Sequence, residues 1–216
     1  NFAKFLMSHG YCVLLYDYRG IGESAPDNLK TSSIYMHEWG TQDMNAALDY
    51  LVNKGITGII WLGHSIGGQL VGLLRNKSHV QKVISINAAL GYWGYLSGPM
   101  KMVIFFLWYV IGPMMVKFYG YGVMKKIGWG ENLPPNAILE WRSWCLSKTY
   151  YMEFLKNKIQ ADRFYNFTIP ITAIYLSDDY IANDKTASLM MQFFPNARCE
   201  LIKLDVHKFT PHRVGH

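Results

Sequence analysis

The sequence has little charge and few cysteines. Only 17% of its 216 residues are charged, and the lysines and arginines, which leave a net charge of +6, are scattered along the chain. Nucleic-acid-binding proteins concentrate basic and aromatic residues, so this distribution argues against nucleic acid as a partner. The three cysteines, Cys12, Cys145 and Cys199, form no CxxC pair and no cluster with histidine. They predict neither a metal site nor a disulfide framework, and they are typical of a reduced, cytoplasmic protein.

Targeting signals, internal repeats and low-complexity tracts are also missing. The first ten residues lack the basic region followed by an apolar run that marks a signal peptide. The chain opens inside an expected amphipathic helix, with Phe2, Phe5 and Leu6 on one face, and it stops on His216 directly after Gly215. We therefore expect both ends to be cut from a longer chain.

Apolar residues, in contrast, are abundant. Hydrophobic residues make up 50% of the chain and aromatic residues 15%, with seven Trp and eleven Met. A chain of this length and composition can bury one sizeable core. We expect one domain that carries an inserted subdomain.

Short apolar runs alternate with helical patterns over much of the chain. Between the runs, residues 39–52 and 66–75 show apolar side chains at helical spacing. Continuous apolar runs are typical of strands buried on both faces. The alternation predicts an α/β fold, a mostly parallel sheet with flanking helices. Its expected strands are residues 12–16, 59–62, 83–86, 171–176 and 199–204.

From Ala88 to about Phe167 this alternation stops. The stretch carries no convincing strand and is rich in Trp, Tyr, Phe, Met and Gly. We therefore expect residues 88–167 to form a helical, aromatic- and Met-rich insertion. Residues 1–87 and 168–216 are then expected to form the α/β core.

Within this insertion lies an uncharged run of fifteen residues, Met102–Val116, between Lys101 and Lys117. Gly112 and Pro113 are expected to interrupt the run, and a membrane span needs about 20 apolar residues. The run therefore does not predict a span. Ordinary helix packing and contact with a membrane or lipid surface are its alternative interpretations.

The sharpest motif is Gly63-His64-Ser65-Ile66-Gly67-Gly68, which directly follows one expected strand and precedes an expected helix. In this context a Gly-x-Ser-x-Gly sequence forms a nucleophile elbow, a tight turn that exposes the serine. Small residues must flank the serine, and Gly63 and Gly67 supply that space. The motif predicts Ser65 as a nucleophile and the N–H of Ile66, at the start of the helix, as an oxyanion donor.

These residues resemble the α/β-hydrolase superfamily, and within it predicted bacterial hydrolases of the esterase and lipase kind. The resemblance implies a serine nucleophile and a helical cap at residues 88–167, whose apolar side chains would admit an acyl or alkyl group. It covers almost the whole chain outside that insertion. Four segments carry it: Gly10–Ser24 resembles a strand and turn, Gly63–Gly68 the elbow, Asp179–Ala182 the acid-bearing loop and Gly215–His216 the histidine-bearing turn.

Asp179 is the expected acid of a Ser-Asp-His triad. It follows the expected strand 171–176 at the carboxyl end, where parallel sheets place functional groups. The neighbouring Asp178 competes for this role, and the Asp-x-Ile-Ala pattern, which resembles the family's acid loop, favours Asp179. Either carboxylate could instead belong to a solvated turn that caps the following helix.

Four histidines are candidates for the base. His64 lies next to the nucleophile in the chain, so we expect it to pack near the elbow. His207, His212 and His216 all follow the last expected strand. The resemblance to a Gly-His turn favours His216, with His207 as the second choice. A surface histidine is the plain alternative for each.

Asp17 and Arg19 also suggest a functional pair. The resemblance implies that this Asp-x-Arg-Gly stretch is a structural turn instead, where the arginine forks onto carboxylate or carbonyl groups. We therefore assign Asp17 and Arg19 to the architecture.

Together these residues predict hydrolysis of a carboxylic ester or thioester. Ser65 attacks, His216 moves the proton, Asp179 orients the imidazole and the N–H of Ile66 holds the oxyanion. Neither a metal nor an organic cofactor is implied, and the substrate-binding residues and oligomeric state stay unknown. The second oxyanion donor of this fold comes from an early loop that we expect to lie outside this chain.

Two alternative functions stay open at this point. One is a catalytically silent binding module of the same fold, and the other is a membrane-associated, lipid-binding protein organised around residues 102–116.

Overall fold

A parallel sheet of four strands lies at the centre of the protein. The computed structural model describes residues 2–96, 98–158 and 162–216. The strands stand in the order β1-β2-β3-β4, and every neighbouring pair is parallel. The expected α/β fold with a mostly parallel sheet and flanking helices is therefore confirmed. The strands are β1 (Ile59–His64), β2 (Val80–Ile86), β3 (Ile171–Leu176) and β4 (Cys199–Leu204).

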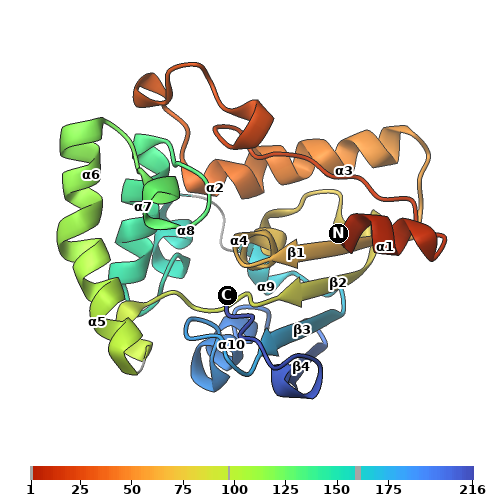
Figure 1. Cartoon of the computed structure of the whole chain (residues 1–216). Helices are drawn as coiled ribbons and strands as arrows, with labels where there is room; N and C mark the ends of the chain where they lie inside the picture. Colours follow the sequence, from red (N-terminus) through yellow and green to blue (C-terminus); the bar gives the residue numbers. More distant parts are fainter. Residues whose placement is uncertain (1, 97, 159–161) are drawn as a thin grey trace.

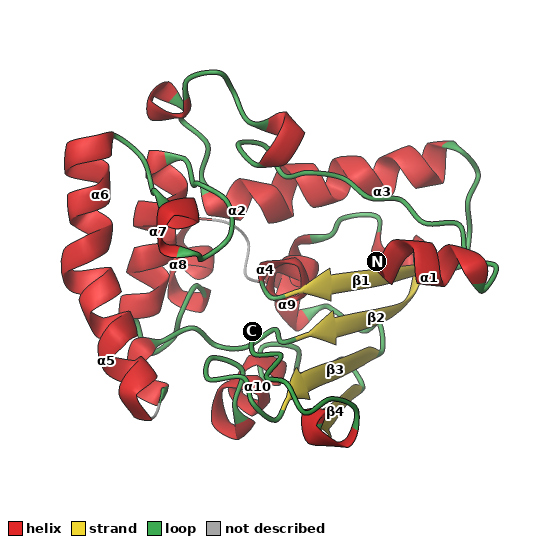
Figure 2. Ribbon diagram, in the orientation of Figure 1, coloured by secondary structure: helices red, strands yellow, loops and turns green. Residues whose placement is uncertain are grey.

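Helices connect and surround these strands (Figure 2). Helix α4 packs against β1 and β2, and α10 packs against β3 and β4. The strands all point toward the helices of residues 88–167, and the C-terminus lies at the same edge of the sheet (Figure 1). The α-helices are α1 (Phe2–Ser8), α2 (Met36–Glu38), α3 (Met44–Asn53), α4 (Ile66–Gln69), α5 (Gly98–Phe106), α6 (Gly112–Tyr119), α7 (Pro135–Leu146), α8 (Met152–Lys158), α9 (Asp162–Tyr165) and α10 (Asp184–Met191).

Strand β1 buries one face more than the other. In β1 the buried Ile59, Trp61 and Gly63 alternate with exposed neighbours, and Ile60 and Leu62 are 42% and 38% exposed. The expectation of strands buried on both faces is therefore wrong for β1. An apolar run alone cannot distinguish the two cases, because folded proteins leave many apolar side chains on their surface.

Residues 12–16 do not form the expected strand. A strand requires a ladder of backbone hydrogen bonds, and this segment is an extended connection whose Leu15 is 74% exposed. Aromatic contacts fix its far end instead: the Tyr18 ring stacks on Trp39 at 4.9 Å, and the Tyr16 ring lies 6.3 Å from that of Trp61. The apolar composition of a segment indicates that it can form a strand, but not that a neighbouring strand is present to pair with it.

The helix expected over residues 66–75 is shorter than predicted. Helix α4 ends at Gln69 and continues only as a 3-10 turn over Leu70–Leu73. The buried side chain of Asn45 forms hydrogen bonds with the backbone that follows this turn. Its amide donates to the carbonyl of Leu73 at 3.1 Å and accepts from the N–H of Arg75 at 2.7 Å. These bonds replace those of a longer helix.

The expected interruption at Gly112 and Pro113 does not occur. Helices α5 and α6 are joined by a π turn over Leu107–Ile111, and Gly98–Tyr119 forms one helix of 22 residues. The N–H of Gly112 bonds to the carbonyl of Leu107, so the next carbonyl in this pattern, that of Trp108, faces a proline without an N–H. The guanidinium of Arg142 donates to that carbonyl at 2.6 Å, which explains why the helix continues.

Residues 88–167 share one hydrophobic core with the sheet. The cluster extends from Leu48 and Val83 to Trp108 and Trp144, all of them at most 1% exposed. Polar bonds reinforce this connection at Gln69, the last residue of α4. Its side chain donates to the carbonyl of Ala89 at 2.9 Å and accepts from the Tyr150 hydroxyl at 3.1 Å, and its carbonyl accepts from the Tyr151 hydroxyl at 2.7 Å.

Candidate active site

Ser65 stands on a sharp bend between β1 and α4. Its φ of 47° and ψ of −115° are unusual for a residue with a side chain. The bend requires glycine both before and after Ser65. A Cβ on Gly63 would overlap the carbonyl of Gly67, and one on Gly68 would lie 2.6 Å from the Ser85 hydroxyl. The predicted elbow sequence therefore forms a tight strand-to-helix turn with Ser65 at its apex.

His216 meets Ser65 from the other end of the chain. Its Nε2 lies 2.9 Å from the Ser65 Oγ, and its side chain is 28% exposed. The preceding Gly215 has a φ of 74°, a conformation that favours glycine, and this turn aims the imidazole at the serine.

Asp179 holds the other side of this imidazole. Its Oδ2 lies 2.7 Å from the Nδ1 of His216, and its side chain is completely buried. Its Oδ1 accepts from the N–H groups of Ile181 at 2.8 Å and Ala182 at 3.0 Å, so both carboxylate oxygens are engaged. With a proton on Nδ1 shared with the carboxylate, Nε2 is left as the acceptor for the Ser65 hydroxyl.

Asp178 forms hydrogen bonds with different groups from those that contact Asp179. Its Oδ2 accepts from the N–H groups of Val214 at 2.7 Å and Gly215 at 3.1 Å. Burial raises the pKa of the Asp178 carboxyl, but these two N–H groups, together with the N–H of Asp178 and the charge of Arg213, hold the pKa below its ordinary value. Asp178 therefore supports the turn that carries His216 and does not contact the imidazole itself.

Asn87 fixes the same turn, although it is not among the site residues predicted from the sequence. This buried residue has a φ of 50° at the carboxyl end of β2. Its side chain donates to the carbonyl of Gly215 at 3.3 Å and accepts from the N–H of Leu176 at 3.0 Å, which connects the ends of β2 and β3 with the His216 turn. The available signal was an asparagine, tolerant of positive φ, directly after an expected strand.

The other candidate histidines lie elsewhere. The His64 ring is 5.3 Å from the His216 ring, and burial, followed by the nearby His216, lowers the pKa of His64, which favours its neutral form. His207 and His212 are exposed, and their backbone N–H groups bond to Asp205 and Thr210. In the part of the chain that the structure describes, His216 is the histidine that contacts Ser65.

Asp17 and Arg19 lie in a structural turn. The Nε and N–H of Arg19 donate to the two oxygens of Asp43 at 2.6 and 3.0 Å, and its carbonyl accepts from the Trp39 indole at 3.0 Å. Asp17 accepts from the N–H of Glu23 at 2.9 Å. These bonds hold the chain beside α3 and leave neither side chain at Ser65.

Ile66, the expected oxyanion donor, directly follows Ser65. Ile66 is the first residue of α4, so its N–H has no partner within the helix. Among the residues with described positions, no group of three or more His, Cys, Asp or Glu side chains could hold a metal ion. A hollow of about 530 Å³ is lined by Leu90, Tyr95, Met152 and Phe193 among others and does not include Ser65, so it does not identify substrate-binding residues.

Solved structures of other proteins share this fold. An extracellular α/β-hydrolase from a Paenibacillus species is 16% identical with a TM-score of 0.54, over 94% of this chain and 82% of that one. An enol-lactonase from Burkholderia xenovorans is 15% identical with a TM-score of 0.51, and a monoacylglycerol lipase from Paleococcus ferrophilus is 9% identical with a TM-score of 0.50; each match covers 88% of this chain and 71% of the other. At this identity the likeness concerns the fold.

At the level of sequence, no curated protein matches the chain. A family model described as serine aminopeptidase, S33, matches residues 1–205, which include Ser65 and Asp179. The match spans most of the chain and agrees with the parallel sheet and the solved structures that share it. The chain therefore belongs to the serine aminopeptidase S33 family of α/β-hydrolases.

Proposed function

We propose that this protein is a serine hydrolase that cleaves a carboxylic ester or thioester through an acyl-enzyme on Ser65. The observation that carries the proposal is the continuous relay from the Ser65 Oγ to the His216 Nε2 at 2.9 Å and from the His216 Nδ1 to Asp179 at 2.7 Å. A serine hydroxyl is a weak nucleophile at neutral pH and needs such a base to remove its proton during attack.

In the proposed reaction, the Ser65 Oγ bonds to the substrate carbonyl carbon while its proton moves to the His216 Nε2. The buried Asp179 carboxylate stabilises the imidazolium that forms, and the N–H of Ile66 donates to the oxyanion. His216 returns the proton to the leaving alcohol or thiol as the bond to the acyl group breaks. Water then repeats the sequence on the acyl-enzyme, which releases the acid and restores Ser65.

The carboxylates of the expected cap favour an ester over the N-terminus of a peptide. An aminopeptidase recognises a substrate ammonium group, for which a carboxylate is the natural partner, and the carboxylates described in this segment already contact other groups of the protein. Three carboxylates of residues 88–167 have described side chains: Glu140 is bound to His37 at 2.8 Å, Glu131 to Lys125 at 3.3 Å and Glu153 to Thr149 at 3.3 Å. The names of the lipase and lactonase of similar fold point to the same class of bond.

The test compares the protein with Ser65→Ala and with Ser78→Ala, an exposed serine outside the proposed site. Both variants are assayed on p-nitrophenyl esters of graded chain length and on aminoacyl p-nitroanilides. We expect ester cleavage that falls at least about 10³-fold in Ser65→Ala and stays unchanged in Ser78→Ala. If the aminoacyl p-nitroanilides are cleaved faster than the esters, the protein is an aminopeptidase and the ester assignment is wrong. Full activity of Ser65→Ala would refute the serine mechanism.

A fluorophosphonate probe separates an enzyme from a silent module of the same fold. Such a probe reacts with a serine only where a base activates it and an oxyanion site accepts the adduct. We expect stoichiometric labelling of Ser65 in the wild type, measured by intact mass, and none in His216→Ala. A wild-type protein that stays unlabelled would favour a binding module.

A further inference from the structure

The helix over Gly98–Tyr119 presents an apolar row to solvent. Its mean hydropathy is 1.7 over its most apolar stretch, yet only 28% of that stretch is buried. A continuous apolar patch that is exposed on a folded protein marks an interaction surface. Five side chains spaced one helical turn apart form this outer row, which we define as Met102, Phe106, Val110, Met114 and Phe118, with exposed fractions between 44% and 68%.

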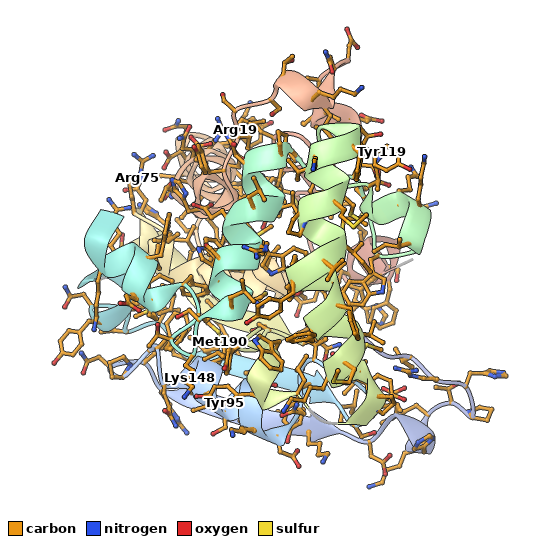
Figure 3. The ribbon with its side chains drawn as sticks, turned by 90° about the vertical axis from the view of Figure 1, so that its left-hand side faces the viewer. Arg19, Arg75, Tyr95, Tyr119, Lys148 and Met190 are labelled. Atoms are coloured by element: carbon orange, nitrogen blue, oxygen red, sulfur yellow. The ribbon has the colours of Figure 1, made fainter. Side chains whose placement is uncertain are left out.

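The opposite face of the same helix belongs to the protein core. Ile104, Leu107, Trp108 and Met115 are at most 5% exposed, and the Trp108 carbonyl is bonded to Arg142 of α7. The helix lies along the outer side of the molecule and faces the viewer in Figure 3, with Tyr119 near its upper end. Because one face is fixed to α7, this helix cannot cross a bilayer with lipid on all sides, but it can lie along one.

Charge around the outer row has a single sign over a long stretch. Residues 50–130 contain neither Asp nor Glu, whereas Lys101, Lys117 and Lys126 lie near the two ends of the helix. The neighbouring Lys125 is paired with Glu131 at 3.3 Å. The Lys117 ammonium lies 5.7 Å from the ring of Phe118, and that of Lys126 lies 4.8 Å from the ring of Tyr119. Lysines that flank an apolar row can reach phosphate groups while the row enters the acyl region.

We propose that the outer row docks flat on a lipid bilayer that contains anionic headgroups. The row supplies no polar group that could fix the orientation of a protein partner, whereas apolar burial and basic flanks are the two terms that drive interfacial binding of a helix. The sequence alone showed no segregated polar face on this helix. In the folded protein the face opposite the lipid is covered by α7, so no polar face is needed. This inference does not depend on the proposed hydrolase activity.

Vesicle flotation of the full chain tests the proposal. We expect the protein to float with phosphatidylcholine vesicles that contain phosphatidylglycerol, and more weakly with phosphatidylcholine alone. The double variant Phe106→Glu, Met114→Glu should lower the bound fraction about tenfold or more, because it places two charges in the acyl region. The matched control Tyr50→Glu changes an aromatic residue of α3 that is 53% exposed, and it should bind like the wild type.

A second pair of variants tests the basic flank. Lys117→Ala with Lys126→Ala should weaken binding to the anionic vesicles and leave binding to the neutral ones unchanged, and added salt should imitate this effect. Circular dichroism melting verifies that each variant is folded, and Phe118→Glu, at the exposed end of the helix, replaces the double variant if that one unfolds.

Several outcomes would overturn the proposal. They are the absence of flotation with either vesicle, equal binding by the folded double variant, or resistance of the bound protein to alkaline carbonate, which would indicate a span. A wild type that elutes as a dimer and becomes monomeric in the double variant would show instead that a second copy covers the outer row.

Discussion

At the residue scale, two adjacent aspartates have separate tasks. Asp179 contacts the His216 imidazole through Oδ2, while Asp178 accepts from the backbone N–H groups of Val214 and Gly215, in the turn that precedes His216. The sequence placed both at the end of one strand and could not separate them by spacing. The separation depends on groups that lie 36 or 37 positions further along the chain: the backbone N–H groups of Val214 and Gly215 for Asp178, and the imidazole of His216 for Asp179.

We expect Asp179→Asn to lower kcat by about 10⁴-fold, because an amide stabilises the wrong tautomer of His216. Asp178→Asn should lower kcat far less and act mainly through the position of the turn. Steady-state kinetics on the best ester, with melting curves for both variants, provide the measurement. Equal losses of kcat in the two variants would contradict this division.

The contribution of Asp178 to the stability of the folded protein should depend on pH. Its pKa is depressed in the folded protein, so its contribution is complete above the ordinary value of 3.8 and is lost as the pH falls through the lower folded value. The melting temperature of the wild type should therefore exceed that of Asp178→Asn near neutral pH, and the difference should shrink below about pH 4. A difference that stays constant between neutral pH and pH 3 would exclude this role.

At the scale of elements, the elbow was predictable and the lengths of its neighbours were not. The Gly-x-Ser-x-Gly sequence specifies a local turn, and its residues are all within reach of one another. The early end of α4 depends on Asn45, and the continuity of α5 into α6 depends on Arg142, both distant in the chain. The missing strand at residues 12–16 has the same cause, since local composition does not encode a ladder partner.

The elbow itself makes a prediction about glycine. Gly63→Ala should strongly destabilise the protein or prevent its folding, because the added Cβ overlaps backbone that cannot move aside. Gly67→Ala is the matched control: its Cβ would lie 3.3 Å from the Tyr18 hydroxyl, at the end of a side chain that can adjust. Urea unfolding of both variants measures the difference, and similar free energies of unfolding would contradict it.

At the scale of the whole molecule, the sheet and residues 88–167 should unfold together. They share one buried cluster, and Tyr150 joins them through Gln69. Five of the seven tryptophans lie in residues 88–167, so tryptophan fluorescence follows mainly this part, whereas far-ultraviolet circular dichroism follows the whole chain. We expect coincident midpoints, and an earlier fluorescence transition would show independent unfolding. Tyr150→Phe should lower both midpoints by the same amount, since Trp141 and Gln69 each lose a partner.

The position of Gln69 also limits how such enzymes can be recombined. Three of its polar groups bond across the boundary with residues 88–167, at the end of the helix that follows Ser65. A chimaera that exchanged this segment for one from another hydrolase would have to supply two hydroxyl groups where Tyr150 and Tyr151 now stand. A replacement segment without these hydroxyl groups would leave the side-chain and backbone oxygens of Gln69 without hydrogen-bond partners. New specificities should therefore be easier to reach by changing side chains than by exchanging the segment.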